Sequence, residues 1–269
     1  MKTLIVIPAR YGSTRLPGKP LLKIAGQTLL GRVVAIAKHV ARHVPNTEIL
    51  IATDDQRILD HAKELDTPCV LTPESCPTGT DRVLAAMKQA QAAPDFIINL
   101  QGDAPLTPPD FVQELINGFE KAPCDIITPV VRLTWVELDA LRESKKTTPF
   151  SGTTAVFNEE TGQAFWFSKT ILPAIRKEEK LQQTNAFAPV WRHIGLYGYS
   201  RAMLEAFVTL PKGFYEEQEG LEQLRALEHG YKIRCVSVNY KGRANTTGVD
   251  SPEDIARVEA LIAKHGEML

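Results

Sequence analysis

Long apolar runs, an excess of charge of one sign and paired cysteines are all lacking from this 269-residue sequence. No run approaches the roughly 18 apolar residues that a transmembrane helix needs, and the N-terminus has no signal-peptide pattern. We therefore expect a cytoplasmic protein without stable membrane association. The four cysteines, Cys69, Cys76, Cys124 and Cys235, show neither CxxC nor Cys/His metal spacing. We expect them to be reduced packing residues rather than disulfides or metal ligands.

The charges nearly cancel, with 31 Lys and Arg against 32 Asp and Glu and a net charge of −1. This balance offers no broad basic surface for nucleic acid or an anionic membrane, so local clusters of cations must serve a local ligand. The sequence also lacks the spacings of a P-loop and the GxGxxG fingerprint of a redox Rossmann enzyme. Both of these classes are therefore excluded.

Short apolar runs alternate with helical patterns along most of the chain. Leu4–Ile7 is an unalternating, mostly β-branched run, typical of a strand buried on both faces of a parallel sheet. We expect further strands over 48–53, 67–71 and 95–100, and helices over 31–43, 57–65, 81–92, 221–229 and 251–264. The alternation predicts an α/β fold with a doubly wound, mostly parallel sheet. Between 122 and 167 the pattern is richer in strands and predicts a smaller inserted lobe within a single domain over 1–269.

The loop after the first strand is rich in cations. Arg10, Arg15 and Lys19 follow the strand within a loop that also holds Gly12, Ser13 and Gly18. In open α/β sheets ligands bind beyond the carboxyl ends of the strands, where backbone N–H groups and fixed cations can hold a polyphosphate. We interpret the loop as a phosphate cradle; the alternative is a basic surface loop.

Two aspartates are candidate ligands for Mg²⁺, which proteins typically hold with one or two carboxylates plus phosphate oxygens and water. Asp103 ends the block Asn99–Asp103 after an apolar strand, and Gly102 permits a close backbone approach there. Asp250 lies in Thr247–Asp250, just before the last predicted helix. The alternatives are a turn-forming role for Asp103 and a helix-start signal at Asp250, where Ser251 is the expected N-cap.

The block Thr78–Arg82 is a candidate for reading a pyrimidine base. Small hydroxyl and glycine positions suit contact with a base edge, and Arg82 can donate to a carbonyl oxygen. The alternative is a helix N-terminus capped by Thr80, with Asp81 favoured by the helix dipole.

A row of polar side chains is expected on one strand over 192–199. Period-two alternation would place His193, Gly195, Tyr197 and Tyr199 on one face, where they could bind an acidic polyol. Glu222 and Gln223, predicted on a helix, offer further groups for hydroxyls. The alternatives are a core histidine with satisfied hydrogen bonds and a solvated Glu-Gln pair.

The order of these blocks resembles that of the 3-deoxy-manno-octulosonate (Kdo) cytidylyltransferases, or CMP-Kdo synthetases. The resemblance covers nearly the whole chain, and the combination of blocks is far more specific than any one of them. It is carried by Pro8–Pro20, Ala52–Asp55, Thr78–Arg82, Asn99–Asp103, Arg192–Tyr199, Leu221–Arg225 and Thr247–Asp254.

The resemblance implies a nucleotide-diphospho-sugar transferase-like fold and Mg²⁺-dependent transfer of a cytidylyl group from CTP to Kdo, for lipopolysaccharide biosynthesis. It also implies a homodimer, with residues of about 122–200 forming a sugar-side and dimerisation lobe. The implied catalytic residues are Arg10, Arg15, Lys19 and Asp103, and the implied metal ligands are Asp103 and Asp250. The remaining implied contacts are Pro8, Ala9, Arg10, Ser13, Lys19, Thr80, Arg82 and Gln101 with the nucleotide, and His193, Tyr197, Glu222 and Gln223 with the sugar.

Some positions depart from the family's pattern, and they cluster on the sugar side. Ala104 replaces a glutamate, Lys169 replaces an arginine, Glu217 replaces a histidine, and Thr153–Val156 replaces a strand that usually carries Val-Lys. An 8-amino analogue of Kdo or another acidic sugar therefore stays open as the substrate. A catalytically inactive nucleotide-binding protein is the alternative from a different class.

Overall fold

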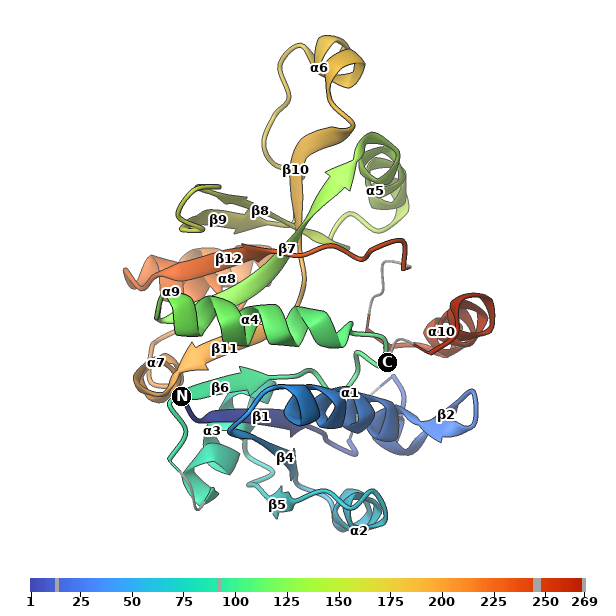
Figure 1. Ribbon diagram of the computed structural model, residues 1–269, viewed down its shortest axis with the longest axis vertical. Coiled ribbons are helices and arrows are strands. Elements are labelled where there is room, and N and C mark those ends of the chain that lie inside the picture. The colour runs from blue at the N-terminus through green and yellow to red at the C-terminus, as the bar shows by residue number, and fades with distance from the viewer. Residues whose placement is uncertain (13–14, 91–92, 244–247, 268–269) are drawn as a thin grey trace. The chain divides into compact units, whose positions relative to one another are not determined.

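The computed structural model (Figure 1) describes the chain apart from residues 13–14, 91–92, 244–247 and 268–269. The chain divides into two compact units. Unit 1 comprises residues 1–122, 196–208 and 240–269, and unit 2 comprises residues 123–195 and 209–239. The lobe expected over 122–200 begins where unit 2 begins, and its roles in sugar binding and dimerisation stay predictions.

Unit 1 contains the predicted parallel sheet. Its strand order is β5 (Cys69–Leu71), β4 (Thr47–Thr53), β1 (Thr3–Pro8), β6 (Phe96–Asn99) and β11 (Tyr197–Ser200). The first four strands run parallel, and β11 runs antiparallel to β6. Residues 3–7 of β1 are all buried, as expected for a strand covered on both faces. The doubly wound, mostly parallel α/β fold is therefore confirmed.

Helices cover both faces of this sheet, as the handedness of the crossovers requires. From β1 the chain moves through β4 to β5, toward one edge of the sheet, and the connecting helices are α1 (Leu29–His43) and α2 (Gln56–Glu64). Because such crossovers are right-handed, both helices lie on the same face of the sheet. The chain then returns from β5 to β6, which puts α3 (Gly79–Gln89) on the other face. α4 (Pro109–Lys121) packs against α1, and α7 (Arg201–Phe207) packs against α3.

The reversal of direction falls between β1 and β6, where a doubly wound sheet opens a crevice for ligands. The predicted phosphate loop follows β1, and the segment that contains Asp103 follows β6. Both lie at the carboxyl ends of adjacent parallel strands, so the fold brings these two segments together.

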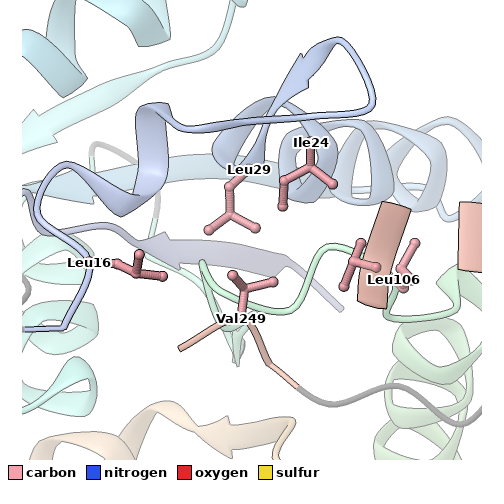
Figure 2. Close-up of a cluster of buried hydrophobic side chains, with 6 residues drawn as sticks. Leu16, Ile24, Leu29, Leu106 and Val249 are labelled. Carbon is pink, nitrogen blue, oxygen red and sulfur yellow. The ribbon is translucent and has the colours of Figure 1, made fainter. Parts of the chain in front are cut away.

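An apolar cluster joins the segments around that crevice. Its buried members are Leu16 in the phosphate loop, Ile24 in β2 (Lys23–Ile24), Leu29 of α1, Leu106, Val249 and Val258. Figure 2 shows that they come from chain segments far apart in sequence. The last of them belongs to α10 (Pro252–His265), which begins at Ser251 as N-cap, as predicted. β2 and β3 (Gln27–Thr28) form a small separate antiparallel sheet.

Unit 2 is mixed and rich in strands, as expected for the inserted lobe. β10 (Phe187–His193) pairs antiparallel with β7 (Ile126–Thr134) and β8 (Thr153–Phe157), and β8 pairs antiparallel with β9 (Ala164–Ser168). β12 (Ile233–Ser237) runs parallel to β7. The helices are α5 (Trp135–Thr147), α6 (Glu178–Thr184), α8 (Phe214–Glu219) and α9 (Leu224–Glu228).

The prediction of one strand over 192–199 was wrong. β10 ends at His193 in unit 2, and β11 begins at Tyr197 in unit 1. His193 is paired with β7 and β8, whereas Tyr197 is opposite Asn99 of β6. Because the chain changes strand partners between these residues, its alternation of side chains does not continue across Gly195, and His193 and Tyr197 do not share a strand face.

Within the described residues, no helix has the length and apolar character needed to cross a membrane. All four cysteines are free thiols, as expected. Burial raises the pKa of Cys69 and Cys124 to about 11 and that of Cys235 to about 12, so these thiols stay protonated and unreactive at neutral pH.

His193 is a buried histidine in the core of unit 2. Its Nε2 shares a hydrogen bond of 2.8 Å with Oγ1 of Thr128, and its ring meets that of Phe167 edge-on at 5.1 Å. Burial, assisted by the charge of Lys169, lowers the pKa of His193 to about 3. The imidazole is therefore neutral at physiological pH.

This neutral burial predicts a pH dependence of stability. Because the folded-state pKa is lowered, the stabilisation is fully present above the unfolded pKa of 6.5 and is lost as pH falls toward about 3. Urea unfolding between pH 7.5 and 4.5 should show His193→Gln losing less stability on acidification than wild type, by up to about 1.4 kcal/mol per pH unit below 6.5. His265→Gln, at the exposed end of α10, is the matched control. Parallel curves for wild type and His193→Gln would contradict the prediction.

Candidate active site

A polar cavity of about 260 Å³ lies at the carboxyl ends of β1 and β6, entirely within unit 1. Most of the predicted nucleotide and metal residues line it: Pro8, Ala9, Arg10, Arg15, Lys19, Arg82, Gln101, Asp103 and Asp250. Ser13 lies outside the described residues. Pro20, Thr78, Gly79 and Gly102, which belong to the blocks singled out in the sequence, also line the cavity, and so do Cys76 and Pro77, for which the sequence suggested no binding role. The structure thus brings the predicted residues to one place, and their individual roles stay predictions.

Two close backbone approaches fix the walls of this cavity. A Cβ at Gly102 would lie 2.4 Å from the carbonyl oxygen of Pro8, so only glycine lets the two loops pass this closely. The backbone N–H of Val249 donates to the carbonyl oxygen of Asp103 at 2.8 Å. The segments that carry Asp103 and Asp250 are therefore joined through their main chains.

The carboxylates of Asp103 and Asp250 meet at the ammonium of Lys19. Lys19 Nζ donates to Asp103 Oδ2 at 3.0 Å, to Asp250 Oδ1 at 3.1 Å and to the carbonyl oxygen of Val249 at 2.7 Å. Only 14% of the Lys19 side chain is exposed, against 35% for Asp103 and 49% for Asp250. The predicted cation of the phosphate loop and the predicted metal ligands thus form one cluster.

The position of Asp250 is set by the start of α10. Asp254 accepts the backbone N–H groups of Asp250 at 2.8 Å and Ser251 at 2.9 Å, within a capping box. Burial would raise the pKa of Asp254, but these N–H donors outweigh burial and hold it below its usual range. The helix-start role is thus observed, and it leaves the predicted metal role open, because the cap fixes the backbone from which the Asp250 carboxylate projects.

These oxygens fit a divalent cation. Two carboxylates and the backbone carbonyl of Val249 surround the ammonium of Lys19. Carboxylate and carbonyl oxygens are also the kinds of ligand that Mg²⁺ binds. No group of three or more His, Cys, Asp or Glu side chains in the described part of the chain is arranged to hold a metal. A Mg²⁺ ion here would therefore need further oxygens from phosphate and water, as is usual for this ion.

Arg10 and Arg15 extend the cation cluster toward solvent. Arg15 is 3.7 Å from Asp250, but its side chain is 71% exposed, so this ion pair contributes little to stability. Arg10 is also exposed. Both long side chains can therefore turn to an anion in the cavity at small cost.

The phosphate loop is positioned by a ring that the sequence analysis missed. The Arg57 guanidinium lies 3.3 Å from the centroid of the Tyr11 ring, and two hydrogen bonds, at 2.9 and 2.6 Å, hold Arg57 on Asp55. Gly18 has φ +70°, and a Cβ there would lie 3.1 Å from that ring. Tyr11 thus fills the space between Arg57 and the turn that leads to Lys19. Tyr11 and Arg57 are far apart in sequence, so no local sequence pattern predicts their contact.

The structure shows that Thr80 is not the N-cap of α3, which was the alternative to its predicted contact with the nucleotide. Thr78, and not Thr80, is the N-cap, in a reciprocal capping box with Asp81. Thr80 is 2% exposed and lies in the first turn. The spacing Thr-x-x-Asp is itself a capping-box pattern, so the sequence held the signal for Thr78. Thr78 and Gly79 line the cavity and place the positive end of the helix dipole there.

Arg82 has protein partners in this structure. Its guanidinium donates to Asp54 Oδ2 at 2.5 Å and to Thr72 Oγ1 at 2.6 Å, and the residue is 3% exposed. The residue still lines the cavity. These two bonds orient the Arg82 side chain. Its predicted contact with a base would have to use the guanidinium N–H groups that these bonds leave over.

The predicted sugar residues are divided between the units. His193, Glu222 and Gln223 belong to unit 2, and Tyr197 belongs to unit 1. Glu222 and Gln223 precede α9 rather than lying within it, because the helix begins at Leu224. Gln223 is 4% exposed, and its Nε2 has no hydrogen-bond partner among the described residues. A buried amide donor of this kind needs an acceptor, which an ordered water or an oxygen of a ligand can supply.

The residues that depart from the family's pattern have different surroundings. Lys169 is half-buried and donates to Thr153 Oγ1 at 3.2 Å, and burial lowers the pKa of its ammonium. The carbonyl oxygen of Lys169 accepts a hydrogen bond from Lys145, whose ammonium also holds the carbonyls of Pro149, Ser151 and Gly152. Glu217 is exposed on α8. Lys169 is thus built into unit 2, whereas Glu217 is a surface carboxylate.

Comparison with known proteins gives the same family as the sequence blocks. A family model described as cytidylyltransferase matches residues 4–233. A 3-deoxy-manno-octulosonate cytidylyltransferase of Maricaulis maris is 44% identical over 271 residues, with 100% of both chains covered. One of Chloroherpeton thalassium is 38% identical, with 98% of this chain and 99% of the relative covered.

Solved structures agree with these relatives. The structure of a CMP:2-keto-3-deoxy-manno-octonic acid synthetase complexed with CTP matches with a TM-score of 0.84 and 34% identity, over 98% of this chain and 99% of that one. A cytidylyltransferase of Leptospira borgpetersenii, at 17% identity and a TM-score of 0.61 over 100% of this chain and 89% of that one, shares the fold. This chain belongs to the 3-deoxy-manno-octulosonate cytidylyltransferase family, whose members are nucleotidyltransferases.

Proposed function

We propose that this enzyme transfers the cytidylyl group of CTP to Kdo with the help of Mg²⁺, giving CMP-Kdo and pyrophosphate for lipopolysaccharide biosynthesis. The observation that carries the proposal is the cluster of Lys19, Asp103 and Asp250 beside Arg10 and Arg15 in one cavity. Cations for a polyphosphate and carboxylates for a divalent ion are there side by side. The names of the relatives give the sugar acid and the cytidylyl group, and a solved relative is complexed with CTP.

In the reaction, the anomeric hydroxyl oxygen of the sugar attacks the α-phosphorus of CTP. A new P–O bond forms to the sugar, the bond between the α-phosphorus and the bridging oxygen breaks, and pyrophosphate leaves. The hydroxyl proton passes to solvent. Arg10, Arg15 and Lys19 offset the negative charge that grows on the leaving pyrophosphate, which is the principal demand of phosphoryl-type transfer.

Asp103 and Asp250 would hold Mg²⁺, which when bound supplies further positive charge at the phosphates. Their placement does not depend on the ion. The Val249 N–H to Asp103 carbonyl bond and the capping box of α10 fix both backbones. The two backbones are thus positioned in advance, which lowers the ordering cost of metal binding.

On the sugar side, the buried amide of Gln223 and the neutral imidazole of His193 suit hydrogen bonds to hydroxyls. Neither adds a negative charge that would repel an acidic sugar. We assign Kdo as the substrate, with its 8-amino analogue second. An exposed carboxylate at Glu217 would favour an ammonium on the sugar if the two came within about 4–6 Å. We further propose that the enzyme is a homodimer and acts in the cytoplasm.

The proposal is tested by pyrophosphate release from CTP with Kdo, 8-amino-Kdo and N-acetylneuraminate, each at several concentrations. Kdo should give the highest kcat/KM. Preference for the amino sugar that is reduced by Glu217→Gln would establish the second substrate instead. Turnover of N-acetylneuraminate alone would contradict a Kdo-type substrate, and CTP binding without any turnover would favour an inactive nucleotide-binding protein.

Loss of either metal carboxylate should abolish most activity. Asp103→Asn and Asp250→Asn each remove a charge that water cannot replace, so kcat with Kdo should fall on the order of 100-fold or more. Asp139→Asn, at an exposed carboxylate of α5, is the matched control and should keep the wild-type rate. A near-native kcat for either site variant at saturating Mg²⁺ would remove that residue from the metal site.

Arg10 should matter for binding more than for folding, whereas Lys19 should matter for both. Arg10 is exposed, so Arg10→Ala should weaken CTP binding and slow turnover while changing the melting temperature little. Lys19→Ala should also weaken CTP binding, but it leaves two carboxylates without the ammonium between them, so the melting temperature should fall as well. Isothermal calorimetry with CTP and thermal unfolding measure the two effects separately, and a fall in the melting temperature of Arg10→Ala that matches its loss in rate would indicate a structural role for Arg10.

A further inference from the structure

We propose that Lys19 couples metal binding to nucleotide binding: its ammonium and the divalent ion compete for the same oxygens, and the triphosphate frees those oxygens by taking the ammonium. The inference deepens the proposed function and rests on it for the identity of CTP and Mg²⁺. It is carried by the geometry of the cluster of Lys19, Asp103, Asp250 and Val249.

The ammonium of Lys19 has no donor to spare. A lysine ammonium carries three N–H groups, and Nζ of Lys19 has an acceptor for each in Asp103 Oδ2, Asp250 Oδ1 and the Val249 carbonyl. A phosphate oxygen that binds Lys19 must therefore displace at least one of these acceptors. Each carboxylate oxygen released in this way becomes accessible to another cation.

The same contacts obstruct a metal. A divalent ion bound to Asp103 Oδ2 and Asp250 Oδ1 would lie within a few ångströms of an ammonium that those oxygens hold at 3.0 and 3.1 Å. The repulsion between the two cations is strong at such a distance, and the 14% exposure of Lys19 limits its screening by water. The metal therefore binds well only when the ammonium moves away.

Lys19 is the part of the cluster that can move. The backbones that carry the two carboxylates are held by the Val249 N–H bond to Asp103 and by the capping box at Asp254, and these short side chains leave the carboxylates little reach. The lysine ammonium is at the end of a flexible four-carbon side chain. Lys19 also lines the cavity that Arg10 and Arg15 line, so a triphosphate placed there lies within its reach.

The coupling has a thermodynamic consequence. If the triphosphate tightens metal binding by a given factor, the metal must tighten triphosphate binding by the same factor. Removing the ammonium removes the competition, so the metal should bind a Lys19 variant more tightly without nucleotide. The coupling factor should then fall to the part that phosphate oxygens contribute by binding the metal directly.

The experiment uses Mn²⁺ as the probe and measures its binding to the full chain by calorimetry and by electron paramagnetic resonance of the free ion. Wild type, Lys19→Met and Lys19→Gln are compared with and without CTP, without sugar, and Mn²⁺ binding to CTP alone is measured in parallel. Lys23→Met, at an exposed lysine of β2, is the matched control.

We expect CTP to tighten Mn²⁺ binding by wild type at least about tenfold. Without CTP, both Lys19 variants should bind Mn²⁺ at least about tenfold more tightly than wild type, and the factor by which CTP then tightens Mn²⁺ binding should be smaller than the wild-type factor by at least about threefold. Lys23→Met should behave as wild type. Equal Mn²⁺ affinity of the Lys19 variants and wild type without CTP would overturn the inference.

A second measurement keeps the inference falsifiable if the variants do not fold. In wild type, Mn²⁺ and CTP together should raise the melting temperature by more than the sum of their separate shifts, after correction for the Mn²⁺–CTP complex. A purely additive shift would overturn the coupling. Pyrophosphate release with Kdo separates the two proposals: turnover with no coupling would leave the proposed function intact, and coupling with no turnover would contradict the function alone.

Discussion

The candidate site depends on a hydrogen bond between the main chains of two of its loops, the loop that carries Asp103 and the loop that carries Asp250. Asp103 and Asp250 are far apart in sequence, and the hydrogen bond from Val249 N–H to the Asp103 carbonyl brings them together. That bond persists because Val249 is buried in the cluster with Leu16, Leu29 and Leu106. Glu259 of α10 adds a further tie by accepting the N–H of Ala25. Apolar packing beneath the loops thus determines where the charged side chains above them lie.

Two carboxylates held this close would repel each other without a cation between them, and Lys19 supplies it. The arrangement places one positive charge where it stabilises the protein and where it can also serve a phosphate. It also explains the mixture of residues in the first loop. Arg10 and Arg15 are exposed and available to an anion, whereas the less exposed Lys19 is held by the acidic pair.

The sequence predicted the parallel strands β1, β4, β5 and β6 of unit 1 and its helices α1, α2, α3 and α10, because hydrophobic period and capping signals are local. It missed α4 and α7 of the same unit. It did not predict the break between His193 and Tyr197, since both sides of the break read as strand and only the change of pairing partners separates them. It also missed α5, although Thr134 and Glu137 form a capping box there. The ion pair of Arg82 in α3 with Asp54 and the stacking of Arg57 in α2 on Tyr11 each join a helix residue to a loop residue far away in sequence, and no local pattern encodes such a contact.

The division of the chain bears on how substrate choice can vary in this fold. The cavity with the phosphate loop and the acidic pair is complete within unit 1, whereas His193, Gln223 and Lys169 belong to unit 2. Of the positions that depart from the family's pattern, Thr153–Val156, Lys169 and Glu217 lie in unit 2, and Ala104 lies in unit 1 just after Asp103. If His193 and Gln223 bind the sugar as proposed, substitutions in unit 2 would change hydrogen bonds to the sugar without disturbing the Val249–Asp103 bond or the Lys19 cluster, since both lie within unit 1. The proposed chemistry at the phosphates would then be physically separable from the recognition of the sugar.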